Sequence, residues 1–226
     1  MKLRSCVLID KKPMKDIKEL LANNKAWSAA IKAKDPDFFP SLAQQQTPRY
    51  MWIGCSDSRV PGTQLVGLHA GELFVHRNVA NIVVHTDFNC LSVLQYAVDV
   101  LRVEHVIVCG HYHCGGVNAA MKNMQLGLID NWLRHVQDVA RSYEVELANI
   151  VDEDERLDRL CELNVVEQVL SVSRTTIVQN AWSNGQELSV HGWIYGLADG
   201  LLRDLGISIS GQDDLDNVYR ETATVS

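Results

Sequence analysis

Short apolar runs of strand length alternate with helical segments along this 226-residue chain. Four runs are typical of strands because β-branched and aromatic residues are frequent in them: 49–55, 72–77, 105–111 and 187–196. Segments with helical spacing of apolar residues separate them. This order predicts an α/β fold, with a mostly parallel β-sheet flanked by helices on both faces. The stretch 207–210, ISIS, is a candidate edge strand.

The ends of the chain differ from its middle. We expect residues 1–13 to be a disordered extension, 14–210 to be a single α/β domain, and 211–226 to be a loose polar tail. Residues 17–33 have apolar residues at helical spacing and predict one or two helices. Pro36 and Pro40 interrupt that pattern.

Charge and composition exclude some classes of protein. The formal net charge is −7, which disfavours binding to a nucleic-acid backbone. No apolar run reaches the roughly 18 residues of a membrane span, and no signal peptide is recognisable at the N-terminus. Six scattered cysteines without a small-scaffold pattern favour a reducing compartment, so we expect a cytoplasmic protein.

Two motifs lie at the carboxyl ends of predicted strands, where α/β sheets bind their ligands. The first is CSDSR at 55–59, and the second is CGHYHCGG at 109–116. Two cysteines and one histidine form a ligand set that suits zinc, with a fourth position open for water. Cys55, His111 and Cys114 fit this set. His113 is an alternative to His111, but a residue directly at a strand end is better fixed.

A carboxylate and a guanidinium follow Cys55 at once. Asp57 is two residues from Cys55 and could take the fourth position on the metal. Arg59 could hold Asp57 away from it in a charge-assisted pair. A carboxylate with two competing partners is a potential switch.

The chain resembles the β-class carbonic anhydrases. The resemblance rests on WIGCSDSRVP, GELFVHRNVAN, HTDFNCLSVLQYAVDVL, VCGHYHCGG, LGLIDNWLRH, LNVVEQV and HGWIYG, and it extends from about residue 14 to about residue 205. It implies one zinc ion per chain on Cys55, His111 and Cys114, with Asp57 as a ligand only in a closed state. It also implies that Asp57 and Arg59 form the catalytic dyad.

The resemblance implies further residues and an assembly. The family forms homodimers or homotetramers in which N-terminal helices reach over a partner subunit. Gln46 matches a substrate-binding glutamine donated across that interface. Positions that line the carbon dioxide pocket match Phe74, Val79 and Tyr96, and a backbone donor to bicarbonate matches Gly115.

The implied activity is reversible hydration of carbon dioxide to bicarbonate and a proton, by attack of a zinc hydroxide. A bacterial-type subset of the family is inhibited by bicarbonate at a separate pocket. Its signature residues match Trp52, Arg77 and Tyr195. We expect bicarbonate there to favour the closed state, with Asp57 on zinc and its pair with Arg59 broken.

Two alternatives stay open. A carbon disulfide or carbonyl sulfide hydrolase could use the same fold and zinc set. A non-catalytic zinc or redox-responsive protein could keep the site closed, although it would have no use for Arg59. A thiol–disulfide enzyme and a nucleotide-binding protein are disfavoured, because the chain has no Cys-x-x-Cys pair and no Gly-rich phosphate loop.

Overall fold

A computed structural model describes residues 16–223, so the predicted extension 1–13 lies outside the described residues. The chain divides into two compact units, one that ends at Gln45 and one that begins at Gln46. Within residues 16–45, helices α1 (Ile17–Lys34) and α2 (Phe38–Gln44) contact each other through the edge-on rings of Trp27 and Phe39. No side chain of residues 16–45 is buried.

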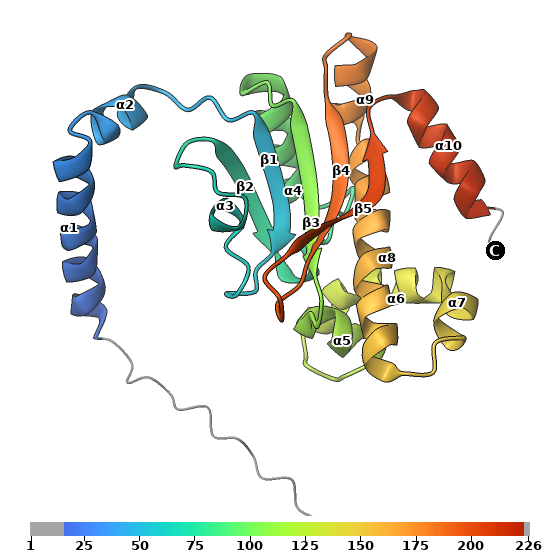
Figure 1. Cartoon of the computed structure of the whole chain (residues 1–226). Coiled ribbons are helices and arrows are strands. Elements are labelled where there is room, and N and C mark those ends of the chain that lie inside the picture. The colour runs from blue at the N-terminus through green and yellow to red at the C-terminus, as the bar shows by residue number, and fades with distance from the viewer. Residues whose placement is uncertain (1–15, 224–226) are drawn as a thin grey trace, which may run out of the picture. The chain divides into compact units, whose positions relative to one another are not determined.

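The second unit is built on a five-stranded sheet in the order β2-β1-β3-β4-β5 (Figure 1). Its strands are β1 (Tyr50–Cys55), β2 (Leu73–Asn78), β3 (His105–His111), β4 (Ser189–Tyr195) and β5 (Leu202–Ile209). The first four are parallel, and β5 pairs with β4 in the antiparallel direction. The predicted mostly parallel sheet is confirmed, and the edge strand is longer than the ISIS stretch.

The helical elements of this unit lie in the following order along the chain. They are α3 (Gly62–Leu65), the 3₁₀ turn η1 (Val79–Asn81), α4 (Phe88–Gln95), the π-helical turn η2 (Tyr96–Val100), α5 (Gly115–Met121), α6 (Ile129–Ser142), α7 (Glu144–Ala148), α8 (Glu153–Ser173), α9 (Thr176–Ser183) and α10 (Gln212–Ala223). Among residues 16–223, no helix combines the length and the apolar character needed to cross a membrane.

The main core lies on one face of the sheet. Met51 and Ile53 of β1 and Val106 and Val108 of β3 point to this face, where buried residues of α4, α8 and α9 cover them. The long helix α8 packs against β3, β4 and β5. The apolar side chains of this face exclude water from the space between the sheet and these helices.

The opposite face carries a smaller cluster around Trp52. Its buried members are Trp52, Ile107 and Cys109, and Tyr195 packs against them. The indole of Trp52 lies back over its own strand, and a Cβ at Gly54 would be 2.3 Å from its Nε1 atom. The alternation of strands and helices predicted helices on both faces of the sheet. Within residues 46–223, α4, α8 and α9 cover the face that carries Met51 and Val106, and the Trp52 cluster lies on the other face.

Helices α6 and α7 follow each other closely, since α6 ends at Ser142 and α7 begins at Glu144. One local prediction differs from the structure. The C-terminal segment expected to be loose contains α10. Leu215 of α10 is buried in the main core, and the Asp214 carboxylate accepts a hydrogen bond from the Ser210 backbone N–H. An apolar contact among acidic residues therefore orders this polar segment.

Candidate metal centre

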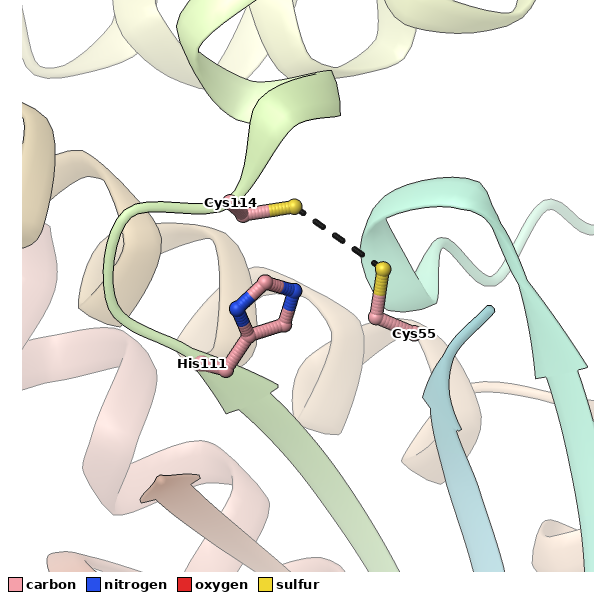
Figure 2. A group of neighbouring side chains, drawn as sticks. All are labelled: Cys55, His111 and Cys114. Atoms are coloured by element: carbon pink, nitrogen blue, oxygen red, sulfur yellow. Dashed lines mark hydrogen bonds between the residues drawn. The ribbon is translucent and has the colours of Figure 1, made fainter. Parts of the chain in front are cut away.

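The ends of two neighbouring strands carry the predicted ligands. Cys55 is the last residue of β1 and His111 the last of β3, and these strands pair in parallel. Cys114 follows after a tight loop, directly before α5. Figure 2 shows the three side chains pointing toward one another, with the two sulfur atoms 3.9 Å apart. One ligand atom of each residue lies within 4.8 Å of the others, and all three residues are buried.

The His111 ring is oriented by the backbone. Its Nδ1 lies 3.0 Å from the Tyr112 carbonyl oxygen, which can only accept, so Nδ1 carries the proton. Nε2 therefore has a free lone pair. Nε2 is buried and has no hydrogen-bond partner among the described residues. A buried, unpartnered nitrogen beside two thiols fits a borderline cation such as zinc.

The two sulfur atoms are unequal. Their mutual hydrogen bond holds the pKa of Cys55 well below its usual range against the effect of burial, and backbone N–H groups act in the same direction. The same bond raises the pKa of Cys114. The site thus favours one thiolate, which is the form that binds metal. Burial raises the pKa of the thiols of Cys90, Cys109 and Cys161, as expected for inert core cysteines.

Asp57 and Arg59 form a two-pronged pair beside these ligands. Arg59 Nε donates to Asp57 Oδ1 at 2.9 Å, and Nη2 donates to Oδ2 at 2.6 Å. The Arg59 guanidinium holds the pKa of the Asp57 carboxyl well below its usual range. Asp57 Oδ2 nevertheless lies 3.7 Å from His111 Nε2. The carboxylate therefore lies between the guanidinium and the predicted metal ligands.

Arg77 has contacts that the sequence did not reveal. Its guanidinium donates to the carbonyl oxygen of Cys55 at 2.8 Å and to that of Asp57 at 2.5 Å. Arg77 therefore holds the backbone that carries both a metal ligand and the competing carboxylate. Trp52 and Tyr195 belong to the cluster on the second face of the sheet. Carbonyl partners leave no mark in a sequence, so the family resemblance implied only an anion-binding role for Arg77, which stays a prediction.

The predicted substrate residues lie on several different elements. The rings of Phe74 and Tyr96 stack with centroids 5.9 Å apart. Val79 packs beside Gly116, and Gly115 opens α5 directly after Cys114. Gln46 is exposed and precedes β1. Their roles toward carbon dioxide and bicarbonate stay predictions.

One contact to the metal centre comes from the η1 turn and was not predicted. The Ala80 backbone N–H donates to Cys55 Sγ at 3.4 Å. Ala80 adopts a left-handed conformation with φ 65° and ψ 27°. That conformation costs a non-glycine residue about 1–2 kcal/mol, so the surrounding structure must hold it. Only an indirect sign of this contact was available: Asn164 and Gln168, whose side chains bond to the same loop, are polar residues on the buried face of α8.

A second group of candidate ligands, His76, Asp87 and Cys90, has a different character. The Asn78 side-chain amide is fixed, because its oxygen accepts from Ile82 N–H and its nitrogen donates to the Ile82 carbonyl. That nitrogen also lies 3.3 Å from His76 Nε2, which must therefore accept. Burial lowers the pKa of His76. His76 is thus a neutral, hydrogen-bonded core histidine.

A mostly parallel sheet with two thiols and one imidazole converging at its carboxyl edge defines an α/β metal-binding protein. The family model described as carbonic anhydrase matches residues 50–202. A carbonic anhydrase of Emericella nidulans is 48% identical over 205 residues, which cover 90% of this chain and 90% of that relative. One of Candida albicans is 37% identical, covering 91% of this chain and 73% of that relative.

Solved structures agree with this match. The β-carbonic anhydrase of Coccomyxa, in complex with acetazolamide, superposes with a TM-score of 0.85 at 37% identity, covering 94% of this chain and 100% of that one. A tetrameric β-carbonic anhydrase of Sordaria macrospora gives a TM-score of 0.81 at 38% identity, covering 85% and 98%. The chain therefore belongs to the carbonic anhydrase family, in its β class.

Proposed function

We propose that this chain catalyses the reversible hydration of carbon dioxide to bicarbonate and a proton, with one zinc ion on Cys55, His111 and Cys114. The convergence of two thiols and the unpartnered His111 Nε2 within 4.8 Å carries this proposal. Zinc, when bound, acts as a Lewis acid that lowers the pKa of a water molecule to about 7.

Asp57 and the two cysteines would provide the orienting carboxylate and the negative charge around the proposed zinc ion. Asp57 stays ionised beside Arg59, so its carboxylate can accept a hydrogen bond from the attacking oxygen and orient that oxygen. Two thiolates neutralise a divalent charge more completely than three neutral imidazoles would. We therefore expect turnover to rise above neutral pH rather than below it.

Zinc content and stopped-flow carbon dioxide hydration, measured together, test the proposal. We expect one zinc per chain and turnover that rises between about pH 6.5 and pH 9. The Cys114→Ser variant, which lacks one thiolate, is the matched control and should lose both. Turnover of carbon disulfide without turnover of carbon dioxide would favour the hydrolase alternative. Full zinc occupancy with neither activity would favour a non-catalytic zinc protein.

We also infer that bicarbonate regulates the enzyme at Trp52, Arg77 and Tyr195. The support is the position of Arg77, whose guanidinium holds the carbonyl oxygens of Cys55 and Asp57. An anion that attracts Arg77 would loosen the turn that carries Asp57. Asp57 Oδ2 is 3.7 Å from His111 Nε2, so a short movement would bring the carboxylate to the metal and close the site.

Tyr195→Phe and Trp52→Ala test the regulatory site. Both should weaken bicarbonate inhibition while zinc binding is retained, because neither residue is a candidate ligand. Tyr143→Phe is a control that removes a hydroxyl donating to Glu167 elsewhere in the fold. Equal bicarbonate inhibition in wild type, Tyr195→Phe and Trp52→Ala would refute the regulatory site and leave the proposed activity standing.

We propose a homodimer or homotetramer in which the N-terminal helices cover a partner subunit. Ile17, Leu21 and Trp27 of α1 are large apolar residues exposed to solvent, which a stable assembly would bury. The Sordaria relative is tetrameric. Sedimentation should show a dimer or tetramer, and Leu21→Glu should weaken it. A monomeric wild type would contradict the assembly.

The compartment we propose is the cytoplasm. The five cysteines among the described residues are all free, including the pair whose sulfur atoms lie 3.9 Å apart. Free, closely spaced thiols are kept by a reducing compartment. Fractionation of the host cell would check this directly.

A further inference from the structure

The loop formed by residues 79–83 is held on both sides of Ala80 by side chains from three other elements. We call this the 79–83 loop. Four side chains bond to its backbone, each at 2.7–2.9 Å: Trp132 to the Val79 carbonyl, Asn164 to the Ala80 carbonyl, Asn78 to both backbone groups of Ile82, and Gln168 to the Val83 N–H. The conformation of this loop is therefore set by hydrogen bonds from outside it.

Two of these side chains form a pair on α8. Gln168 Nε2 donates to Asn164 Oδ1 at 3.1 Å, one helical turn away. Asn164 Nδ2 in turn donates to the Ala80 carbonyl, and Gln168 Oε1 accepts from Val83 N–H. Asn164 and Gln168 are only 1% and 4% exposed. A buried, connected amide network is rigid, because a group that lost its partner would stay desolvated.

Close packing brings this loop to the metal centre. A Cβ at Gly116 would lie 2.8 Å from Val79 Cγ1 and 3.3 Å from the Ala80 Cβ. A Cβ at Gly110 of β3 would lie 2.5 Å from Val165 Cγ2 of α8. The two glycines thus let the loop and α8 approach the strand ends. Ala80 N–H then points at Cys55 Sγ, at 3.4 Å.

We propose that Asn164 and Gln168 are positioning residues of the metal centre, which fix the Ala80 N–H on the sulfur of Cys55. A hydrogen bond to a ligating sulfur draws charge from it and fixes its direction. The α8 amides therefore control how Cys55 meets the metal, although neither touches a ligand. This inference rests on the proposed zinc site at Cys55.

The test compares Gln168→Met with Gln179→Met in the full-length protein. Gln168→Met keeps side-chain length but removes both amide bonds of the network. Gln179 is a matched control, since its Nε2 donates to the Ser173 carbonyl at the C-terminal end of α8, outside the network. We expect zinc affinity, measured against a colorimetric chelator, to fall about 10–100-fold in Gln168→Met and to stay unchanged in Gln179→Met.

A spectroscopic readout separates positioning from general destabilisation. In cobalt-substituted protein, the thiolate-to-metal absorption should shift in Gln168→Met and in Asn164→Leu but not in Gln179→Met. Wild-type zinc affinity and an unshifted cobalt spectrum in both network variants would overturn the inference. An equal loss of zinc affinity in the Gln179→Met control would overturn it as well.

Amide hydrogen exchange on the wild type keeps the inference testable if the variants do not fold. The Val83 N–H donates to Gln168, and the Ala80 N–H donates to Cys55 Sγ. Both amides should stay protected after zinc is stripped, because α8 rather than the metal holds the loop that carries them. Protection that appears only when zinc is added would overturn the inference while the proposed function stands. A wild type that binds no zinc would overturn both.

Discussion

Replacement of Asp57 by asparagine should remove activity while leaving the fold almost intact. The pair with Arg59 is partly solvated, with the arginine side chain 57% and the aspartate side chain 17% exposed. Such a pair contributes about 0–1 kcal/mol to the free energy of unfolding. Asparagine also retains an oxygen that can accept from the Arg59 backbone N–H, as Asp57 Oδ1 does at 2.9 Å. We expect Tm to fall by no more than about 2–4 °C for a chain of this size.

The expected loss of turnover is far larger. Asp57 Oδ2 lies 3.7 Å from His111 Nε2, so the carboxylate borders the proposed zinc site. Loss of a group that orients the attacking oxygen lowers a rate by about 10²-fold or more. The assay is stopped-flow carbon dioxide hydration on zinc-saturated protein, with Tm measured by calorimetry on the same samples.

Asp138→Asn provides the matched control. Asp138 pairs with Arg141 on α6, where the two side chains are 61% and 66% exposed. This variant should keep both turnover and Tm. Wild-type turnover in Asp57→Asn would refute the catalytic role. A fall in Tm several times larger than expected would show that the pair is structural and that the solvation argument is wrong.

Three further outcomes follow from the same geometry. Chelation of the wild type should abolish carbon dioxide hydration, and added zinc should restore it. Added zinc should not restore activity in Cys114→Ser. Activity that survives in metal-free protein would contradict the zinc site. The folded pKa of Asp57 lies below its unfolded value of about 3.9, so its stabilisation is present above that pH and is lost as the pH falls through the folded value. The Tm difference between wild type and Asp57→Asn should therefore begin to narrow below about pH 4 and keep narrowing as the pH falls further, and a constant difference would contradict this. Gly110→Ala should lower the free energy of unfolding by about 1–3 kcal/mol, because the added Cβ would lie 2.5 Å from Val165 Cγ2. Gly211→Ala is the control and should not lower Tm, since a Cβ there meets open space. Equal Tm values for the two variants would contradict the packing argument.

The metal centre was predictable because its geometry follows from topology. Strand ends are visible in the sequence where a β-branched run stops, and parallel neighbours bring those ends to one edge. Cys55 and His111 could therefore be placed together before any coordinates were known. Cys114 followed from its three-residue separation from His111. The remaining parallel strands were predicted from the alternation of strands and helices along the chain and from the family resemblance.

The features that escaped prediction depend on the backbone or on sparse apolar contacts. The left-handed φ of Ala80 cannot be read from an alanine, which rarely adopts it. Arg77 binds two carbonyl oxygens, and every residue has one. Helix α10 depends on Leu215, a buried apolar residue within an acidic run that resembles a loose tail. In each case tertiary contacts override the local pattern.

The end of β2 and the turn after it, residues 77–82, contact Cys55 from two directions. Arg77 holds the Cys55 carbonyl, and Ala80, three residues later, holds the Cys55 sulfur. Between them, Asn78 closes the turn through both backbone groups of Ile82. Because these residues are contiguous, an anion that displaces Arg77 would also strain the contact of Ala80 with the sulfur. The proposed bicarbonate site and the proposed α8 network would then act on the same metal ligand, one through its carbonyl and the other through its thiolate.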